Sequence, residues 1–320
     1  MTISELKRDL PARFSGYYRI RKPFKCLATN GSPYLACLLE DMSGSLKAFA
    51  WSNRYRGQTT FADLDRVIVT GSTCTLQHGI VVHLEEAEVV EQAPDLPTSL
   101  IPRSLCPLPH LLDQLDSAVA ALDIEPLRMF TRSILADDSI ALRLISLPAS
   151  RKHHHSYPGG LLEHSMSCAE IIGRMSEFPR PVLELGIVGA LFHDVGKIHL
   201  YNDNGNRLSS AHVIDHDDLT LEVLAGHLKE LDNQCRDAGT ALRYIWSWRR
   251  NRQNRRPPLI TIAEAVLLAD HISAGINAEV LAFGDRQHWQ QTASLNERTR
   301  FWRPNLSRET ALADSCRIRN

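Results

Sequence analysis

The stretch LFHDVGK, residues 191–197, decides which fold can be predicted for the second half of this chain. It ends a segment, residues 181–195, in which apolar side chains recur at helical spacing, so a helix is expected there. His193 and Asp194 would be neighbours on that helix, about 100° apart around its axis, and their side chains could converge on one ion. A single His-Asp pair arises by chance in many long chains, so its meaning depends on the surrounding sequence.

Two other segments carry side chains of the same kinds. His164 ends PGGLLEH, residues 158–164, and Asp270 lies in LLADH, residues 267–271. Asp270 belongs to an otherwise apolar predicted helix, and a buried carboxylate is costly unless it is paired or bound to a metal. A hydrolytic metal site needs imidazole and carboxylate ligands on rigid elements, with one position left for water. Together with the His-Asp pair, these segments predict a divalent-metal site inside a helical bundle.

The composition is that of an ordinary globular protein. The 320 residues suffice for two domains at roughly 150 residues each, and the net charge of −1 gives no overall electrostatic signature of nucleic-acid binding. The seven cysteines show no CxxC spacing, which argues against a zinc ribbon and a disulfide framework. The N-terminus lacks a signal sequence, and no apolar run approaches the ~18 residues that span a bilayer. We therefore expect a cytoplasmic protein without a membrane segment.

The first part of the chain, residues 1–92, is rich in β-forming residues separated by turn signals. The expected strands are Tyr17–Thr29, Tyr34–Glu40, Ser45–Trp51, Arg66–Leu76 and Ile80–Val90. Five strands, with an insertion between the third and the fourth, are typical of a small Greek-key barrel of the oligonucleotide-binding (OB) type. Closely spaced prolines in residues 93–109 then predict a semi-rigid linker.

Helical periodicity replaces the strand pattern after this linker. The expected helices are His110–Leu122, Pro126–Leu135, Leu161–Phe178, Pro181–Val195, Leu219–Leu231, Ala241–Arg249 and Thr261–Ile272. They define a helical domain over residues 110–280, and residues 281–320 form a C-terminal extension to which the sequence assigns no role. The predicted fold class is therefore multidomain, with a β-barrel followed by an all-α bundle.

The motifs resemble those of a known family. His164 and His193 are separated by 28 residues in the pattern H-x28-HD-x-x-GK, and with a late aspartate this pattern resembles the HD superfamily of metal-dependent phosphohydrolases. The segment HHSYPGGLLEH, residues 154–164, is similar to HD proteins that follow an OB barrel, the YhaM-type 3′→5′ exoribonucleases. It is equally similar to the HD module of TraI-type, relaxase-associated proteins of conjugative elements. The resemblance covers most of residues 150–275, and the order of domains extends it to nearly the whole chain.

The resemblance implies a set of site residues. The ligands of a first metal ion would be His164, His193, Asp194 and Asp270. Manganese is the expected ion, with Mg²⁺, Fe²⁺ and Ni²⁺ as alternatives, because imidazole–carboxylate sites suit Mn²⁺. Asp194 would also orient the attacking water, and the ammonium of Lys197 would stabilise charge on the phosphate. His154 and His155 are expected to contact the metal ligands or the phosphate rather than the ion itself.

A second metal ion is left open by the sequence. Its candidate ligands are His212, His216 and His227, although His212 and His216 could equally be histidines of a surface loop. YhaM-type proteins carry a Ser-His-His-Gly segment before the final helix, whereas residues 246–256 of this chain read WSWRRNRQNRR. This departure puts a complete two-metal exonuclease site in doubt.

The same region suggests a contact with nucleic acid. Residues 236–256 contain seven arginines and one acidic residue, interleaved with tyrosine and tryptophan. Cations can follow a phosphate backbone and aromatic rings can stack on bases, although a solvated helix end with tryptophans in the core would show the same composition. The residues predicted to bind nucleic acid are Arg249, Arg250, Arg252, Arg255 and, on the barrel, Trp51.

These expectations lead to one principal function and two alternatives. The first is a metal-dependent phosphodiesterase that acts on single-stranded RNA or DNA as a 3′→5′ exonuclease. The second is a nucleic-acid-binding accessory protein of a conjugative or integrative element, with a weakly active or structural HD domain. The third is a phosphohydrolase of free nucleotides, which the attached barrel disfavours. Assembly into a homo-oligomer is left open.

Overall fold

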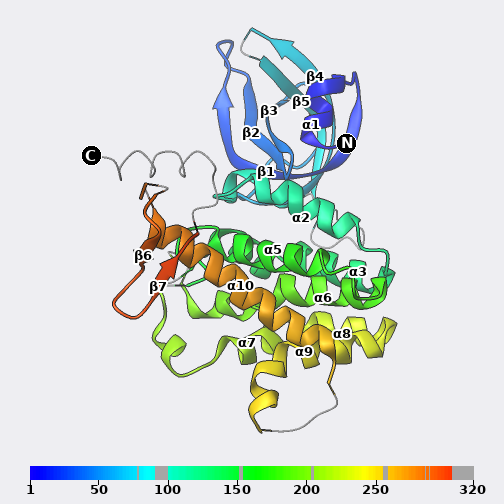
Figure 1. Cartoon of the computed structure of the whole chain (residues 1–320). Helices are drawn as coiled ribbons and strands as arrows, with labels where there is room; N and C mark the ends of the chain where they lie inside the picture. Colours follow the sequence, from blue (N-terminus) through cyan, green and yellow to red (C-terminus); the bar gives the residue numbers. More distant parts are fainter. Residues whose placement is uncertain are drawn as a thin grey trace, which may run out of the picture.

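The chain folds into a β-barrel followed by a helical bundle, as Figure 1 shows. The computed structural model describes residues 1–320 apart from 78, 91–99, 151–153, 203–204, 255–258, 285, 288 and 305–320, and for 249–254 it describes the backbone alone. The predicted fold class is confirmed: a closed barrel is followed by helices. The domain boundaries stay predictions.

The barrel has five strands in the order β1-β2-β3-β5-β4, closed by pairing of β1 with β4. Neighbouring strands are antiparallel except β3 and β5, which are parallel. This is the Greek-key arrangement of an OB barrel. The strands are β1 (Phe14–Leu27), β2 (Pro33–Asp41), β3 (Gly44–Trp51), β4 (Arg66–Leu76) and β5 (Gly79–Val89).

A short helix that the sequence analysis did not predict covers one end of the barrel. It is α1 (Ile3–Asp9), and Thr2 and Glu5 form a capping box at its start. Ile3 and Leu6 are fully buried in the barrel core. The helix is short, so its stability depends on this packing rather than on its own periodicity.

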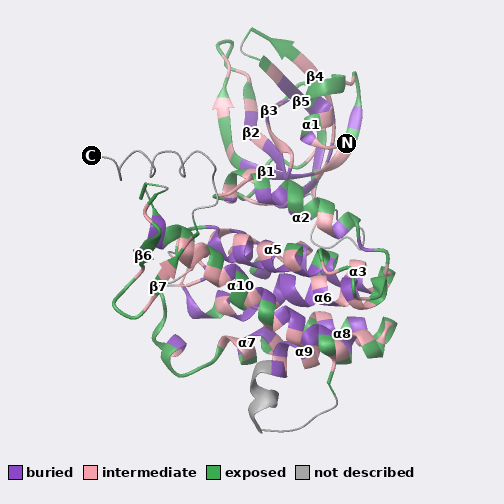
Figure 2. Ribbon diagram, viewed as in Figure 1, coloured by how far each residue is buried: buried purple, intermediate pink, exposed green. Residues whose placement is uncertain are grey.

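The helical part is built from nine α-helices within the described residues, and its core lies around α5 and α6 (Figure 2). The helices are α2 (His110–Ala120), α3 (Glu125–Ala136), α4 (Asp138–Ser146), α5 (Gly160–Gly173), α6 (Arg180–Phe192), α7 (His216–Val223), α8 (Ala225–Gln234), α9 (Arg236–Asn254) and α10 (Thr261–Phe283). Short 3₁₀ helices are η2 (Arg103–Leu105), η3 (Val195–Leu200) and η4 (Ser209–His212), and a hairpin of β6 (Thr292–Ser294) and β7 (Arg300–Trp302) packs beside the end of α10.

Two predicted helices differ from the observed ones near the site. The helix expected over residues 181–195 ends at Phe192, so the His-Asp pair follows α6 instead of lying within it. The helix expected over residues 219–231 is two helices, α7 and α8, which meet at Leu224. In both places apolar residues continue at helical spacing past the point where the observed helix ends. They do so because the residues before and after that point are buried in the same core.

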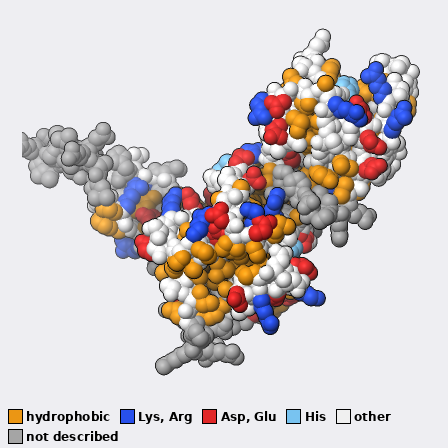
Figure 3. Space-filling view, turned by 90° about the vertical axis from the view of Figure 1, so that its right-hand side faces the viewer, with side chains coloured by type: hydrophobic (Ala, Val, Ile, Leu, Met, Phe, Trp, Pro, Cys, Tyr) orange, Lys and Arg blue, Asp and Glu red, His pale blue; other side chains and the backbone are white. Residues whose placement is uncertain are grey.

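The last helix, α10, is longer and more apolar than the sequence analysis expected. By length and composition alone it could cross a membrane, with a mean hydropathy of 1.3 in its most apolar window, of which 28% is buried. It packs on α5, α6 and α9, so its inner face belongs to the helical core. Its outer face carries the exposed side chains of Leu268, Ile272, Ile276 and Val280. Figure 3 shows hydrophobic side chains gathered on one face of the helical part.

Ion pairs join the barrel to the helical part. Arg19, which is 3% exposed, and Arg66 both leave the barrel to contact the carboxylate of Asp138 at the start of α4. Leu100 and Ile101 are buried at this junction, and Ile101 belongs to the core of the helical part. The described end of the predicted linker is therefore packed against the domains rather than exposed between them.

Candidate metal centre

Three elements bring four candidate ligands together. His164 lies on α5, His193 and Asp194 follow α6, and Asp270 lies on α10. His164 Nε2 lies 3.1 Å from Asp270 Oδ1 and 3.5 Å from Asp194 Oδ2. His193 Nε2 lies 3.5 Å from Asp194 Oδ2 and 3.8 Å from Asp270 Oδ1. The sequence separated these residues by up to a third of the chain, and the fold places their ligating atoms around one point.

These atoms fit a divalent ion. The ring of His193 is held by its Nδ1, 2.7 Å from the carbonyl oxygen of Ala190, while its buried Nε2 has no hydrogen-bond partner among the described residues. Adjacent ligands of an ion with bonds of about 2.1 Å lie roughly 3 to 3.5 Å apart, which is close to the observed spacing. Two imidazoles and two carboxylates also make up the donor set that suits a hydrolytic transition metal.

Both carboxylates of the site are ionised despite their burial. Burial opposes ionisation of Asp194 and Asp270, but the surrounding cations and histidines outweigh it and hold the pKa of each carboxyl well below its usual range. Burial also opposes charge on His193, yet the Asp194 and Asp270 carboxylates raise its pKa to about 9. Burial lowers the pKa of His164. At neutral pH a proton on His193 therefore stands where a metal ion would bind.

Metal affinity is expected to depend on pH through this proton. His193 must lose its proton to become a ligand, and its pKa of about 9 lies above the ordinary value of 6.5. From pH 6 to pH 8 the affinity for Mn²⁺ should therefore rise by about tenfold per unit, with one proton released per ion. Calorimetric titrations in buffers of different ionisation enthalpy measure both quantities. An affinity that stays constant over this range would contradict the assignment of His193.

The residues after the His-Asp pair shape the site. Lys197 Nζ forms an ion pair with Asp194 Oδ2 and is 14% exposed, so its charge lies at the edge of the site. Gly196 donates its backbone N–H to Thr220 Oγ1 at 3.0 Å, and a Cβ at this position would overlap the backbone of α7. Glycine is therefore needed so that η3 can pack directly against α7.

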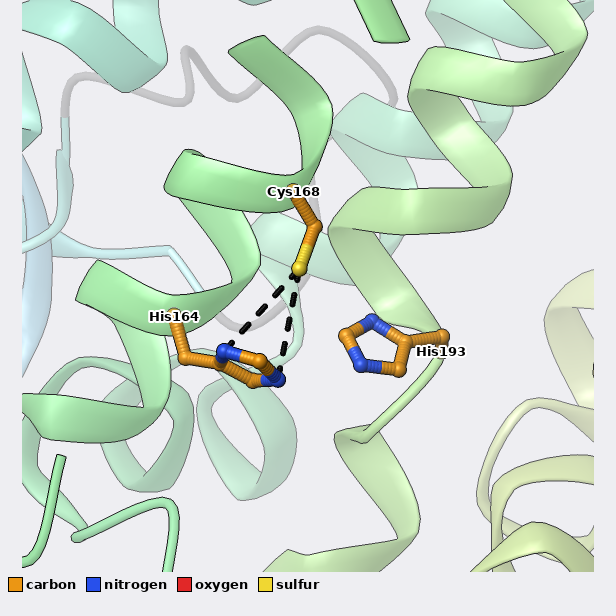
Figure 4. Close-up of side chains that lie close together, drawn as sticks. All are labelled: His164, Cys168 and His193. Carbon is orange, nitrogen blue, oxygen red and sulfur yellow. Dashed lines mark hydrogen bonds between the residues drawn. The ribbon is translucent and has the colours of Figure 1, made fainter. Parts of the chain in front are cut away.

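Cys168 is a neighbour of the site that the sequence analysis missed. It lies one turn after His164 on α5, and its sulfur is 3.9 Å from His164 Nδ1 and 4.0 Å from Nε2 (Figure 4). The ligating atoms of His164, Cys168 and His193 all lie within 4.8 Å of one another. Burial raises the pKa of the thiol, so it is uncharged at neutral pH in the metal-free protein. The i, i+4 spacing from His164 was the available signal.

The three histidines considered for a second ion lie in different surroundings. His216 Nε2 is 3.2 Å from Asp194 Oδ1 and 3.3 Å from Asp217 Oδ1, and Asp215 holds its Nδ1 at 3.1 Å. His212 is exposed. His227 contacts Ser133 at 3.0 Å and Asp137 at 3.4 Å, so its ring faces α3 and the start of α4.

A small cavity of about 40 Å³ lies beside the candidate ligands. Its polar lining residues are His193, His216, Asp217 and Asp270. Trp246 and Trp248 also line it, and both are buried. Trp246 Nε1 donates to the carbonyl oxygen of Gly189 at 2.8 Å. These two indoles therefore pack in the core beside the site, and they are not available to stack on bases at the surface.

The other predicted contact residues fall into two groups. His154 and His155 lie in the loop before α5; the His154 ring is 5.0 Å from that of His164, and His155 Nδ1 is 3.1 Å from Glu163 Oε2. Burial lowers the pKa of His154 to about 4. Of the arginines predicted to bind nucleic acid, Arg249, Arg250 and Arg252 lie on α9 with side chains outside the described part, and Arg255 lies outside the described residues.

Trp51 lies at the end of β3 in an aromatic cluster on the outside of the barrel. Its ring stacks on Tyr34 of β2 at 4.6 Å between centroids, and Phe49 is 6.3 Å away. Alternation along β3 explains this position, because Leu46, Ala48 and Ala50 point into the core and the residues between them point outward.

Comparison with known proteins gives two family matches. Residues 161–275 match the model of the HD domain, and residues 112–177 match the TraI_2 model, described as a putative helicase. The HD match contains His164, His193, Asp194 and Asp270. The predicted resemblance to HD proteins and to TraI-type proteins is thus confirmed. The chain carries an HD domain that follows an OB-type barrel.

Curated relatives cover most of the chain at low identity. The 3′-5′ exoribonuclease YhaM of Bacillus subtilis (strain 168) is 22% identical over 275 residues, which are 82% of this chain and 84% of the relative. The protein of the same name from Oceanobacillus iheyensis is 21% identical over 93% of this chain and 96% of its own length. That of Shouchella clausii is 25% identical over 82% of this chain and 83% of its own. These similarities support the interpretation of this chain as a nuclease, which is a class of hydrolase.

Among solved structures, the second OB-fold domain of replication protein A from Methanococcus maripaludis aligns with 29% of this chain and 96% of its own length. The TM-score is 0.24 and the sequence identity is 16%.

Proposed function

We propose that this HD-domain protein is a metal-dependent phosphodiesterase that degrades single-stranded nucleic acid in the 3′→5′ direction. The observation that carries the proposal is the group of four ligating atoms from His164, His193, Asp194 and Asp270, 3.1 to 3.8 Å apart across the contacts described above. The direction of cleavage is proposed from the names of the relatives, which are 3′-5′ exoribonucleases.

Within the site, each side chain has a distinct task. His164, His193, Asp194 and Asp270 would hold the ion, for which we propose Mn²⁺. A bound divalent ion lowers the pKa of a coordinated water toward neutrality and polarises a phosphoryl oxygen. Asp194 would also accept a hydrogen bond from the attacking water and so orient it. Lys197 lies at the edge of the site, and its ammonium would stabilise charge on a substrate phosphate.

A second ion position is proposed on the other oxygen of Asp194. Asp194 Oδ1, His216 Nε2 and Asp217 Oδ1 are acceptors that face one another at 3.2 and 3.3 Å, so a proton or a cation must lie between them. Asp215 holds the opposite ring nitrogen of His216, the arrangement that orients a histidine ligand. The adjacent cavity has room for a few water molecules.

The surface of the barrel supports a single-stranded substrate. Tyr34, Phe49 and Trp51 form a row of stacked or tilted rings, and Phe24, on the neighbouring strand, is 56% exposed. Aromatic rings offer stacking surfaces to unpaired bases of any sequence, and Lys47, exposed on the same face of β3, can approach a phosphate. Paired bases hide their faces within the duplex, so this row favours a single strand.

Replacing Trp51 by alanine should weaken the binding of single strands by about 5- to 150-fold, because base stacking contributes about 1–3 kcal/mol per base. Fluorescence anisotropy with a labelled oligonucleotide measures this change. Trp302→Ala is the control, since Trp302 is an exposed tryptophan that lies on the β6–β7 hairpin, outside the barrel. Equal affinity of wild type and Trp51→Ala would show that the strand does not cross this row.

A substrate screen tests the proposed function directly. Purified protein, with Mn²⁺ added, is incubated with end-labelled single-stranded RNA, single-stranded DNA, duplexes of both, and free nucleotides. We expect mononucleotides from single strands, shortened from the 3′ end, and no product without the metal. Hydrolysis of free nucleotides alone, or no hydrolysis of any substrate, would overturn the proposal.

A nucleic-acid-binding accessory protein of a conjugative or integrative element remains the second candidate. The match of residues 112–177 to the TraI_2 model favours it, as does the replacement of the Ser-His-His-Gly segment of YhaM-type proteins by an arginine-rich one. In the screen, this role predicts binding of single strands with little or no cleavage at any metal concentration.

A further inference from the structure

His154 lies directly beside two of the candidate metal ligands. Its ligating atom and those of His164 and Asp270 all lie within 4.8 Å of one another. We infer that His154 is a further ligand of the metal ion through Nε2. The inference rests on the proposed metal centre and adds a third imidazole to it.

The ring of His154 lacks the partner that a buried imidazole normally has. Its Nε2 is buried and has no hydrogen-bond partner among the described residues. Burying such a group unpaired costs about 1–3 kcal/mol, so native structures seldom leave it so. The ring of His164, whose Nε2 points at Asp270 and Asp194, lies 5.0 Å away. A metal ion bound by His164 and Asp270 would also be the partner that His154 Nε2 lacks.

The two helices that carry His164 and Asp270 also hold the His154 loop. The backbone N–H of His155 donates to Asn277 Oδ1 of α10 at 2.7 Å, and the His155 ring contacts Glu163 of α5. Ser150 Oγ donates to the carbonyl oxygen of His154 at 2.7 Å. Because α5 and α10 also carry His164 and Asp270, these bonds set the position of His154 relative to both.

The backbone of this loop is strained. His155 has φ of +47°, in the left-handed region that costs a residue with a side chain about 1–2 kcal/mol. The loop also packs so closely on the start of α5 that a Cβ at Gly160 would overlap the carbonyl oxygen of His155. Strain of this kind persists where the surroundings enforce it, often at functional sites. Here the strained residue directly follows His154 in the chain.

A third imidazole changes which ions the centre prefers. Three histidines and two carboxylates leave an octahedral ion one position for water or substrate. Imidazole binds transition ions such as Mn²⁺ and Fe²⁺ better than Mg²⁺, which prefers oxygen ligands and retains its waters. The ion expected at this centre is therefore a divalent transition ion rather than Mg²⁺.

The test counts ligands and does not depend on activity. Full-length wild type and His154→Ala are titrated with Mn²⁺ and followed by electron paramagnetic resonance, and pulsed spectra of the bound ion count its histidine nitrogens. We expect about 10- to 100-fold weaker binding in the variant, two nitrogens instead of three, and a smaller preference for Mn²⁺ over Mg²⁺. Equal affinity together with an unchanged nitrogen count would overturn the inference.

Two further variants keep the outcome interpretable. His154→Gln retains much of the side-chain volume, and should lose the nitrogen signal as His154→Ala does. His110→Ala removes an exposed histidine at the start of α2 and should behave as wild type. Thermal unfolding without metal shows whether the variants fold. A wild type that binds Mn²⁺ through only two histidines overturns this inference alone, whereas a wild type that binds no metal overturns the proposed function with it.

Discussion

Changing both His193 and Asp194 to alanine is expected to abolish the Mn²⁺-dependent release of mononucleotides from single-stranded RNA or DNA. The double variant loses two of the four ligating atoms and also the carboxylate that would orient the water. Loss of a group that only supports a ligand typically costs 10–100-fold, so loss of two ligands should reduce the rate by more than about 1000-fold.

The measurement is the initial rate of mononucleotide release at saturating Mn²⁺, with metal content determined on the same samples. Asp194→Asn is a useful companion variant, because it preserves the shape of the side chain while removing its charge. Binding of single strands by the barrel should change little in both variants, since Trp51 lies on β3 of the barrel and the replaced groups follow α6 in the helical part. Release at the wild-type rate by the double variant would eliminate the HD site as the source of hydrolysis.

Replacing Asp138 should weaken the contact between the barrel and the helical part. We expect lower stability and slower degradation of long substrates. Its carboxylate contacts Arg19, which is almost fully buried, and Arg66 at 2.8 Å, both on the barrel. Loss of one member of a buried charged group leaves the other unpaired and costs 3–5 kcal/mol. Asp138 is 38% exposed, so we expect about 2–3 kcal/mol for Asp138→Ala and a melting temperature lower by about 5–10 °C.

The control and the functional readout distinguish coupling from general damage. Asp123→Ala removes an exposed carboxylate, 78% accessible, from an ion pair with Arg180 and should change stability by less than about 1 kcal/mol. Asp138→Ala should slow degradation of long single strands more than hydrolysis of a small phosphodiester, because only the long substrate must contact both domains. Equal loss on both substrates would show that the ion pairs do not align the barrel with the site.

Much of the fold was predictable because its signals are local. The strands of the barrel are runs of β-forming residues bounded by turn residues, and β3 also alternates buried Leu46, Ala48 and Ala50 with outward-facing residues. Apolar side chains at helical spacing identify most of the helices. The first helix and the short helix α4 were not predicted. Seven and nine residues are too few for a clear pattern, and both helices depend on the surfaces that they cover.

The candidate site was only partly predictable. His164, His193, Asp194 and Asp270 stand in recognisable motifs, and the structure brings them together. The prediction that the His-Asp pair lies within a helix was wrong, since α6 ends at Phe192 and the turn that follows directs both side chains inward. Cys168 was missed although it follows His164 at i, i+4 spacing on α5, and Asp217 becomes a neighbour of the site only through packing.

The sequence alone determined the order of the two domains, the residue types of the candidate metal ligands and the departure from the Ser-His-His-Gly segment, because these depend on spacing and side-chain chemistry. The tertiary structure decided which groups share one centre. It placed His216 at Asp194 and His227 at Asp137, and it put the indole of Trp246 in the core. These outcomes follow from the angles at which helices distant in the chain cross, and no local pattern in the sequence encodes those angles.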